Sequence, residues 1–97
     1  MIVISVLYPS GHALDMDYYR SRHLPLVRRL LAPRGMTELG YYCPAQPSAY
    51  QLVAELRFAD REEADAALAA HGPETQADIA NFTAAPPVIL VGEFVGA

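Results

Sequence analysis

Residues 15–27 read DMDYYRSRHLPLV, and the rest of the chain is best interpreted outward from this stretch. Asp15, Tyr19 and His23 are spaced four apart, so in a helix they line up along one face. The apolar residues of the stretch fall on roughly the same side, which is the side that a helix normally buries. A histidine there is unusual, because burying a group that titrates near neutral pH costs free energy unless the group is partnered or used.

The helix that contains this stretch has recognisable ends. Asp15 is a suitable N-cap, and the pattern predicts a helix from there to about residue 31, before the Pro33-Arg34-Gly35 turn. Pro25 lies inside this helix. It lacks the N–H that would bond the carbonyl of Ser21, so we expect a kink just after His23.

Other segments supply strands and a second helix. Strand patterns cover residues 2–8, 38–42, 50–58 and 88–95, and the first and last of these are apolar on both faces. Asp60 and Glu63 resemble a capping box that starts a helix through the alanine-rich residues 64–70. We expect Gly72-Pro73 to close that helix, with a short extra turn over residues 74–80. This places His71 at a helix C-terminus, where the helix dipole favours a cation.

The resulting order, β-α-β-β-α-β, has no repeat or linker, so residues 1–97 are predicted to form one domain. The order predicts an α+β fold of the ferredoxin-like type, with an antiparallel four-stranded sheet and both helices on one face. Two helices cover only one side of such a sheet, whereas the first and last strands are apolar on both. An apolar patch of that size rarely stays exposed, so we predict a two-fold homodimer packed sheet to sheet.

Composition excludes several classes of function. The net charge is −4 with only 7 basic residues, which argues against nucleic acid or an anionic membrane surface as a partner. The arginines near the first helix are interpreted as a solvated face. Cys43 is alone, so no internal disulfide forms. Without a signal-peptide pattern or an apolar run of membrane-spanning length, a cytoplasmic location is expected.

Several short segments carry a family resemblance. Leu7-Tyr8-Pro9 closes the first predicted strand, and DMDYY at 15–19 is followed by HLPLV at 23–27. HG at 71–72, ADIANFT at 77–83 and PVI at 87–89 come later. In order and spacing, over nearly the whole chain, these segments resemble the EthD family of the dimeric α+β barrel superfamily.

The resemblance implies a dimeric barrel and a small-molecule function. The family takes its name from a gene cluster for ethyl tert-butyl ether degradation, and the reaction of most members is unknown. The wider superfamily includes cofactor-free quinone-forming monooxygenases, lactone isomerases, and cyclases or dehydratases of aromatic polyketides. This chain has Leu90 where similar sequences often have Gln, which would make a pocket there more apolar. It also lacks the Trp that some superfamily oxygenases use.

His23 is the leading candidate for catalysis, because its unperturbed pKa suits proton transfer at neutral pH. The alternative is a core histidine held by hydrogen bonds. Tyr8 and Tyr19 are candidates for binding a substrate in the same cavity, although Tyr19 also fits a core aromatic. The candidate binding residues in the second half of the chain are Asp78, Asn81, Thr83 and Leu90, and the first three also suit turn stabilisation.

No spacing of His, Cys, Asp or Glu matches a metal site, and no nucleotide or phosphate motif is present, so neither a metal nor a cofactor is expected. Two functions remain. One is a cofactor-independent isomerase, dehydratase or cyclase, decarboxylase or monooxygenase, with His23 as general acid or base acting on an apolar oxygenated or aromatic metabolite. The other is a non-catalytic accessory protein that binds a hydrophobic small molecule. A cavity of about 300 Å³ or more beside His23 would favour both over a filled assembly module.

Overall fold

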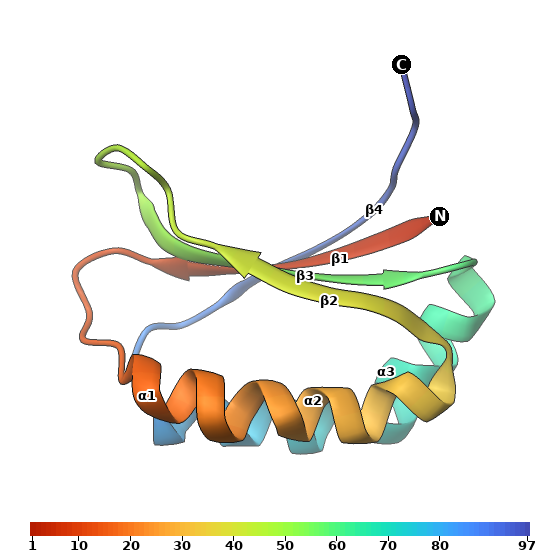
Figure 1. The fold of residues 1–97 in the computed structure, drawn as a ribbon, viewed down its shortest axis with the longest axis horizontal. Helices are drawn as coiled ribbons and strands as arrows, with labels where there is room; N and C mark the ends of the chain where they lie inside the picture. The colour runs from red at the N-terminus through yellow and green to blue at the C-terminus, as the bar shows by residue number, and fades with distance from the viewer.

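The computed structural model describes residues 1–97 as a sheet covered on one face by helices (Figure 1). The strands are β1 (Ile2–Pro9), β2 (Met36–Tyr42), β3 (Tyr50–Phe58) and β4 (Val88–Glu93). They pair antiparallel in the order β2-β3-β1-β4. The helix layer contains α1 (Met16–Tyr18), α2 (Leu24–Leu31) and α3 (Arg61–Ala77). This is the predicted ferredoxin-like arrangement.

The core lies between the sheet and the helix layer. Ile4 of β1 stands opposite Leu56 of β3, and both side chains are buried on the helix side. One cluster of buried apolar residues joins these strands to α2 and α3. A second cluster, rich in aromatic rings, lies nearer to α1 and consists of Tyr8, Tyr19, Leu52, Ile79 and Phe82. Leu52, Ala54, Leu56 and Phe58 alternate along β3, and all four are buried.

The predicted first helix is present but is not uniform. Asp15 caps it, with a side-chain oxygen that accepts a hydrogen bond from the backbone N–H of Tyr18 at 3.1 Å. Between α1 and α2 the chain forms a π-helical turn, Tyr19–His23, in which the N–H of Leu24 bonds the carbonyl of Tyr19. Pro25 follows in the first turn of α2. At the position of the expected kink the structure has a π-helical turn that ends at His23, and such a turn is one of the ways a helix adapts to a missing N–H.

The predicted end of the second helix was wrong. Gly72-Pro73 does not close it, because α3 continues through Pro73 to Ala77 and passes into a 3-10 turn, η3 (Asp78–Asn81). Thr75 Oγ1 donates to the carbonyls of His71 and Gly72 at 3.2 and 2.9 Å, which gives these carbonyls a partner near the proline. His71 consequently lies inside the helix and not at its C-terminus.

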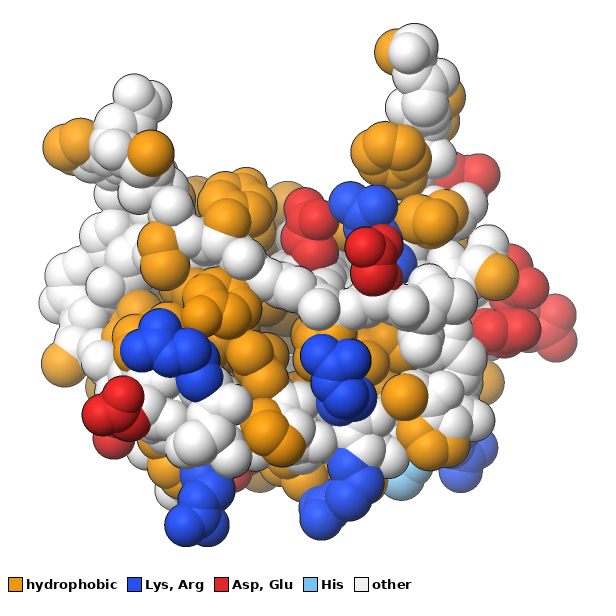
Figure 2. Space-filling view, in the orientation of Figure 1, with side chains coloured by type: hydrophobic (Ala, Val, Ile, Leu, Met, Phe, Trp, Pro, Cys, Tyr) orange, Lys and Arg blue, Asp and Glu red, His pale blue; other side chains and the backbone are white.

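The sheet face opposite the helices is mixed in character. Every residue of β4 is exposed. Arg57 of β3 forms ion pairs on this outer face with Glu38 and Glu55, at 3.7 and 3.2 Å. Arginine side chains also line the outside of the helix layer, as Figure 2 shows in blue. None of the helices has the length and apolar character needed to cross a membrane.

Candidate functional site

His23 is buried at the end of the π-helical turn, with 5% of its surface exposed. Its ring stacks on that of Tyr19, with centroids 5.6 Å apart and planes at 24°. Its Nδ1 atom lies 2.9 Å from Oδ2 of Asp78, the first residue of η3. The sheet positions this pair. Since β1 and β2 run opposite to β3 and β4, the helices that link them run antiparallel, and the start of the first helix lies beside the end of the second.

The carboxylate of Asp78 is held by two further donors. Tyr18 Oη donates to Oδ1 at 2.7 Å, and Asn81 Nδ2 donates to the same oxygen at 3.0 Å. Burial alone would raise the pKa of Asp78, but the hydrogen bonds from Tyr18, Asn81 and His23 outweigh it and leave the pKa below its usual value. Asp78 is therefore a carboxylate at neutral pH, and it accepts all three hydrogen bonds.

Burial sets the protonation state of His23, and this carboxylate sets its tautomer. Burial disfavours the imidazolium and lowers the pKa of His23, while the hydrogen bond to Asp78 opposes that shift only in part. The ring is then neutral near pH 7, and its single proton resides on Nδ1, facing the carboxylate. Nε2 is left with a free lone pair, which is the state that a general base requires.

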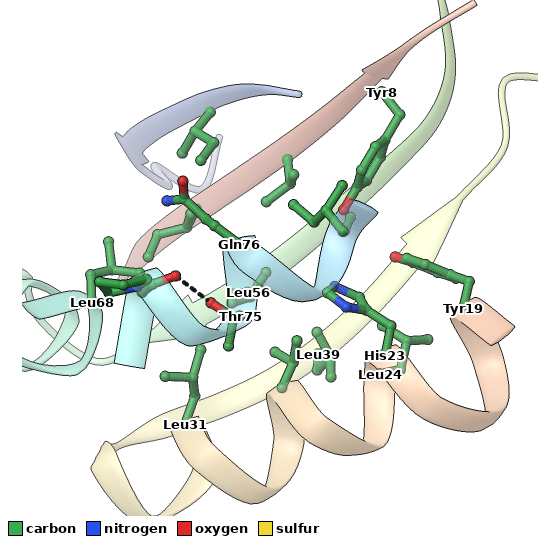
Figure 3. A pocket seen from close by; sticks show the side chains of 18 residues that line it. Tyr8, Tyr19, His23, Leu24, Leu31, Leu39, Leu56, Leu68, Thr75 and Gln76 are labelled. Atoms are coloured by element: carbon green, nitrogen blue, oxygen red, sulfur yellow. Dashed lines mark hydrogen bonds between the residues drawn. The ribbon is translucent and has the colours of Figure 1, made fainter. Parts of the chain in front are cut away.

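An apolar cavity of about 360 Å³ lies beside this pair, between the helices and the sheet. Of the 18 residues that line it, 13 are hydrophobic. His23, Tyr8 and Tyr19 are at one end of the cavity, and Leu31 and Leu68 are toward the other (Figure 3). Its size and lining suit a small apolar molecule with few polar groups.

Comparison with known proteins identifies the family. The family model described as EthD domain matches residues 11–86, which is most of the chain. The chain belongs to the EthD family. No curated protein matches the sequence.

Solved structures agree with this membership. An EthD-like protein from Ralstonia eutropha JMP134 is 29% identical, with a TM-score of 0.82 over 95% of this chain and 89% of that one. An EthD family protein from Bacillus halodurans C-125 is 18% identical, with a TM-score of 0.71 over 98% and 99% of the two chains. A putative antibiotic biosynthesis monooxygenase from Nitrosomonas europaea, at 17% identity, has a TM-score of 0.57 over 99% and 100%. The last two show a shared fold alone.

The structure of this EthD-family chain brings together most of the residues singled out from the sequence. Tyr8, Tyr19 and His23 line the cavity. Asp78 and Asn81 belong to the hydrogen-bond network behind His23 and are not among the lining residues. Thr83 is buried elsewhere, where its hydroxyl donates to the carbonyl of Ala13 at 2.8 Å and ties two loops together.

Leu90 is the predicted site residue that stands apart from the others. It pairs with Ser5 across the sheet, whereas its neighbour Ile89 pairs with Val6 and lines the cavity. Side chains alternate along a strand, so Leu90 points to the outer face, and 56% of its surface is exposed. Leu90 does not line the cavity, so it cannot make the cavity more apolar as the sequence predicted.

Sequence reasoning missed the pairing of His23 with Asp78 and the role of Tyr18 behind it. The strand order was enough to predict antiparallel helices, which bring the start of one beside the end of the other. The pairing escaped notice because the second helix was predicted to end at Gly72-Pro73, so the direction of the turn that contains Asp78 was not defined. Its true position at the junction of α3 and η3 is what aims it at His23.

Proposed function

We propose that this chain is a small-molecule enzyme in which His23 acts as general base and then general acid on an apolar oxygenated or aromatic substrate. The observation that carries the proposal is a buried histidine, hydrogen-bonded to a carboxylate, beside an apolar cavity. Asp78 would hold the ring in one tautomer and stabilise the imidazolium that forms during proton transfer. Isomerisation, dehydration, decarboxylation and oxygen-dependent oxidation can all begin with such a proton transfer.

The test begins with a search for ligands. Aromatic, ketonic and lactone metabolites are screened by ligand-induced thermal shift, and those that bind are incubated with the protein and followed by NMR. His23→Ala should lower turnover by about 10²-fold or more while the fold is retained. His12→Ala is the matched control, because His12 is an exposed histidine in a loop outside the cavity. Equal turnover by the wild type and His23→Ala would reject the catalytic role.

A second function, a non-catalytic protein that binds a hydrophobic molecule, is supported by the same cavity. It differs in two measurable ways. Ligand affinity would survive His23→Ala, and the wild-type protein would convert none of the ligands it binds. The original proposal requires conversion by the wild type, so a bound ligand that is recovered unchanged under every condition favours the binding function.

A further inference from the structure

Tyr19 presents a polar atom that the fold leaves unused. Its side chain is fully buried, and its Oη makes no hydrogen bond to any other group of the chain. The residue lines the cavity. Figure 3 shows its hydroxyl pointing toward the end of the cavity that also holds the imidazole of His23 and the hydroxyl of Tyr8. A buried polar atom without a partner is rare in folded proteins and calls for an explanation.

The ring of Tyr19 is fixed in this orientation. It makes edge contacts with three aromatic rings, those of Tyr8, Tyr41 and Phe82, at centroid distances of 6.3, 5.3 and 5.1 Å. On its other side it stacks on His23. The hydroxyl therefore cannot swing away to find a partner elsewhere. Burial raises the pKa of Tyr19 above its ordinary value, so the phenol is neutral and its O–H is a hydrogen-bond donor.

Two of the polar groups at this end of the cavity, the Tyr19 hydroxyl and the His23 imidazole, have complementary hydrogen-bonding requirements. Tyr19 Oη offers a proton and requires an acceptor oxygen, and Nε2 of His23 offers a lone pair and requires a proton. A carbonyl oxygen next to an acidic C–H bond meets both demands within one small molecule. The remaining lining is largely apolar, which requires a hydrophobic body on the same molecule.

We infer that the substrate is an enolisable ketone with an apolar body, and that Tyr19 Oη binds its carbonyl oxygen. This inference rests on the proposed role of His23 as the base. Nε2 removes the proton from the carbon next to the carbonyl, and the electron pair of that C–H bond forms a C=C bond. The carbonyl π pair moves to the oxygen, which becomes an enolate that accepts the O–H of Tyr19. Return of the proton to carbon or oxygen completes the step, without an oxidant.

The Tyr19 donor acts more strongly as the reaction proceeds, because a hydrogen bond to an enolate oxygen is stronger than one to a neutral carbonyl. Tyr19 would accordingly contribute both to selection of the ketone and to the rate of proton removal. These two contributions are measured separately below.

The first experiment measures selection. The affinities of 2-tetralone and of tetralin, its hydrocarbon counterpart, are determined by isothermal titration calorimetry for the wild type, Tyr19→Phe and Tyr42→Phe. Tyr42→Phe makes the same chemical change at an exposed position outside the cavity. In Tyr19→Phe the preference for the ketone over the hydrocarbon should fall about tenfold, with tetralin binding unchanged. An unchanged preference, or a wild type that binds tetralin as tightly as the ketone, would overturn the inference.

The second experiment measures proton removal and separates the two proposals. Exchange of the α-protons of 2-tetralone for deuterium is followed by NMR in D₂O, above the rate without protein. Wild type and Tyr42→Phe should exchange at equal rates, His23→Ala should lose the catalysed exchange, and Tyr19→Phe should be at least about tenfold slower. If His23→Ala is inactive and Tyr19→Phe is not slowed, the oxygen site is rejected and the proposed function stands.

The reverse result is equally informative. If the wild type catalyses no exchange but its preference for the ketone depends on Tyr19, the enzymatic function fails and the oxygen-binding site remains. The Tyr19→Phe protein should fold, because it keeps the ring and removes only the unpaired hydroxyl. A circular dichroism spectrum and melting temperature close to those of the wild type check this point.

Discussion

His23 and Asp78 form a pair in which only one partner is charged. In a buried ion pair, two charges lose their hydration, and the pair must offset both desolvation costs. When a neutral imidazole donates to a carboxylate, only the carboxylate has this cost. The carboxylate of Asp78 is stabilised by Tyr18 and Asn81 as well, so its charge does not depend on His23 alone. The arrangement keeps the imidazole neutral and oriented near pH 7.

This balance predicts a pH dependence of stability. The folded state lowers the pKa of His23 below its ordinary value of 6.5, so at and below about pH 6.5 the unfolded chain binds more protons. The contribution of His23 to the free energy of unfolding is therefore fully present above about pH 6.5. It is lost as the pH falls through the pKa of the folded state. Urea unfolding between about pH 7.5 and about pH 5.5 should show the free energy of unfolding falling on acidification.

The same series on His23→Asn isolates the contribution of the imidazole. Asparagine keeps an N–H donor for Asp78 but does not titrate, so the decline in stability over this range should be shallower than in the wild type. Asp78 itself acts at lower pH, because its folded pKa is lowered from 3.8 and its contribution is lost only as the pH falls further. Parallel pH profiles for the two proteins would show that His23 is not the group responsible.

At the scale of residues, the sequence predicted which side chains belong to the site better than it predicted which of them contact one another. The spacing of Tyr19 and His23 on an apolar helix face correctly placed both side chains inside the protein. The chain also marks Asp78 and Asn81 as polar residues among hydrophobic ones. Patterns of single residues do not show how side chains on two different helices point toward each other. The contact between His23 and Asp78, and the lack of a partner for the Tyr19 hydroxyl, are therefore seen only in the structure.

At the scale of elements, the two prolines inside helices have different consequences. Pro25 follows a π-helical turn, whereas Pro73 is accommodated within α3 with Thr75 bonding nearby carbonyls. The capping residues Asp15 and Asp60 were predicted from sequence because an N-cap is a local interaction between near neighbours. The outcome at an internal proline depends on what the rest of the helix packs against, which explains why the end of α3 was predicted incorrectly.

We expect the π-helical turn to lower the stability of the fold while it positions His23 beside the cavity. In Pro25→Ala an N–H is restored at this position, which allows a regular α-helix to run through Ser21 and turns His23 relative to the cavity. We expect the free energy of unfolding to rise by about 1 kcal/mol or more, since proline is disfavoured inside helices. Turnover should fall at least about tenfold, because small displacements of a catalytic group are costly. Urea unfolding and activity are measured on the same samples.

Pro44→Ala is the matched control, since Pro44 lies in the loop between β2 and β3 and not in a helix. It should leave turnover unchanged. A Pro25→Ala protein with raised stability but wild-type turnover would show that the π-helical turn does not position His23. Unchanged stability together with unchanged turnover would instead mean that the turn persists without the proline.

At the scale of the whole molecule, element order was enough to predict the architecture. Four strands and two helices in this order have few ways to bury the apolar faces in two layers, and the observed sheet order is one of them. The outer face was harder to predict. The ion pairs of Arg57 make its centre partly polar, and its exposed apolar residues gather along β4 and the C-terminal segment.

This apolar edge is the basis for the last prediction, a homodimer through the outer face. Leu90, Phe94 and Val95 are all exposed, and the C-terminal segment extends from the sheet on the side away from the helices (Figure 1). Apolar surface of this kind is typical of a contact between subunits.

Leu90→Glu would place a charge in that contact and should weaken dimerisation by about 10²-fold or more, while lowering the stability of the single chain only slightly. Ala70→Glu, on the exposed surface of α3, adds the same charge to the helix layer and should leave the dimer intact. Sedimentation velocity at micromolar concentration distinguishes these outcomes, and a wild-type protein that sediments as a monomer would refute the dimer.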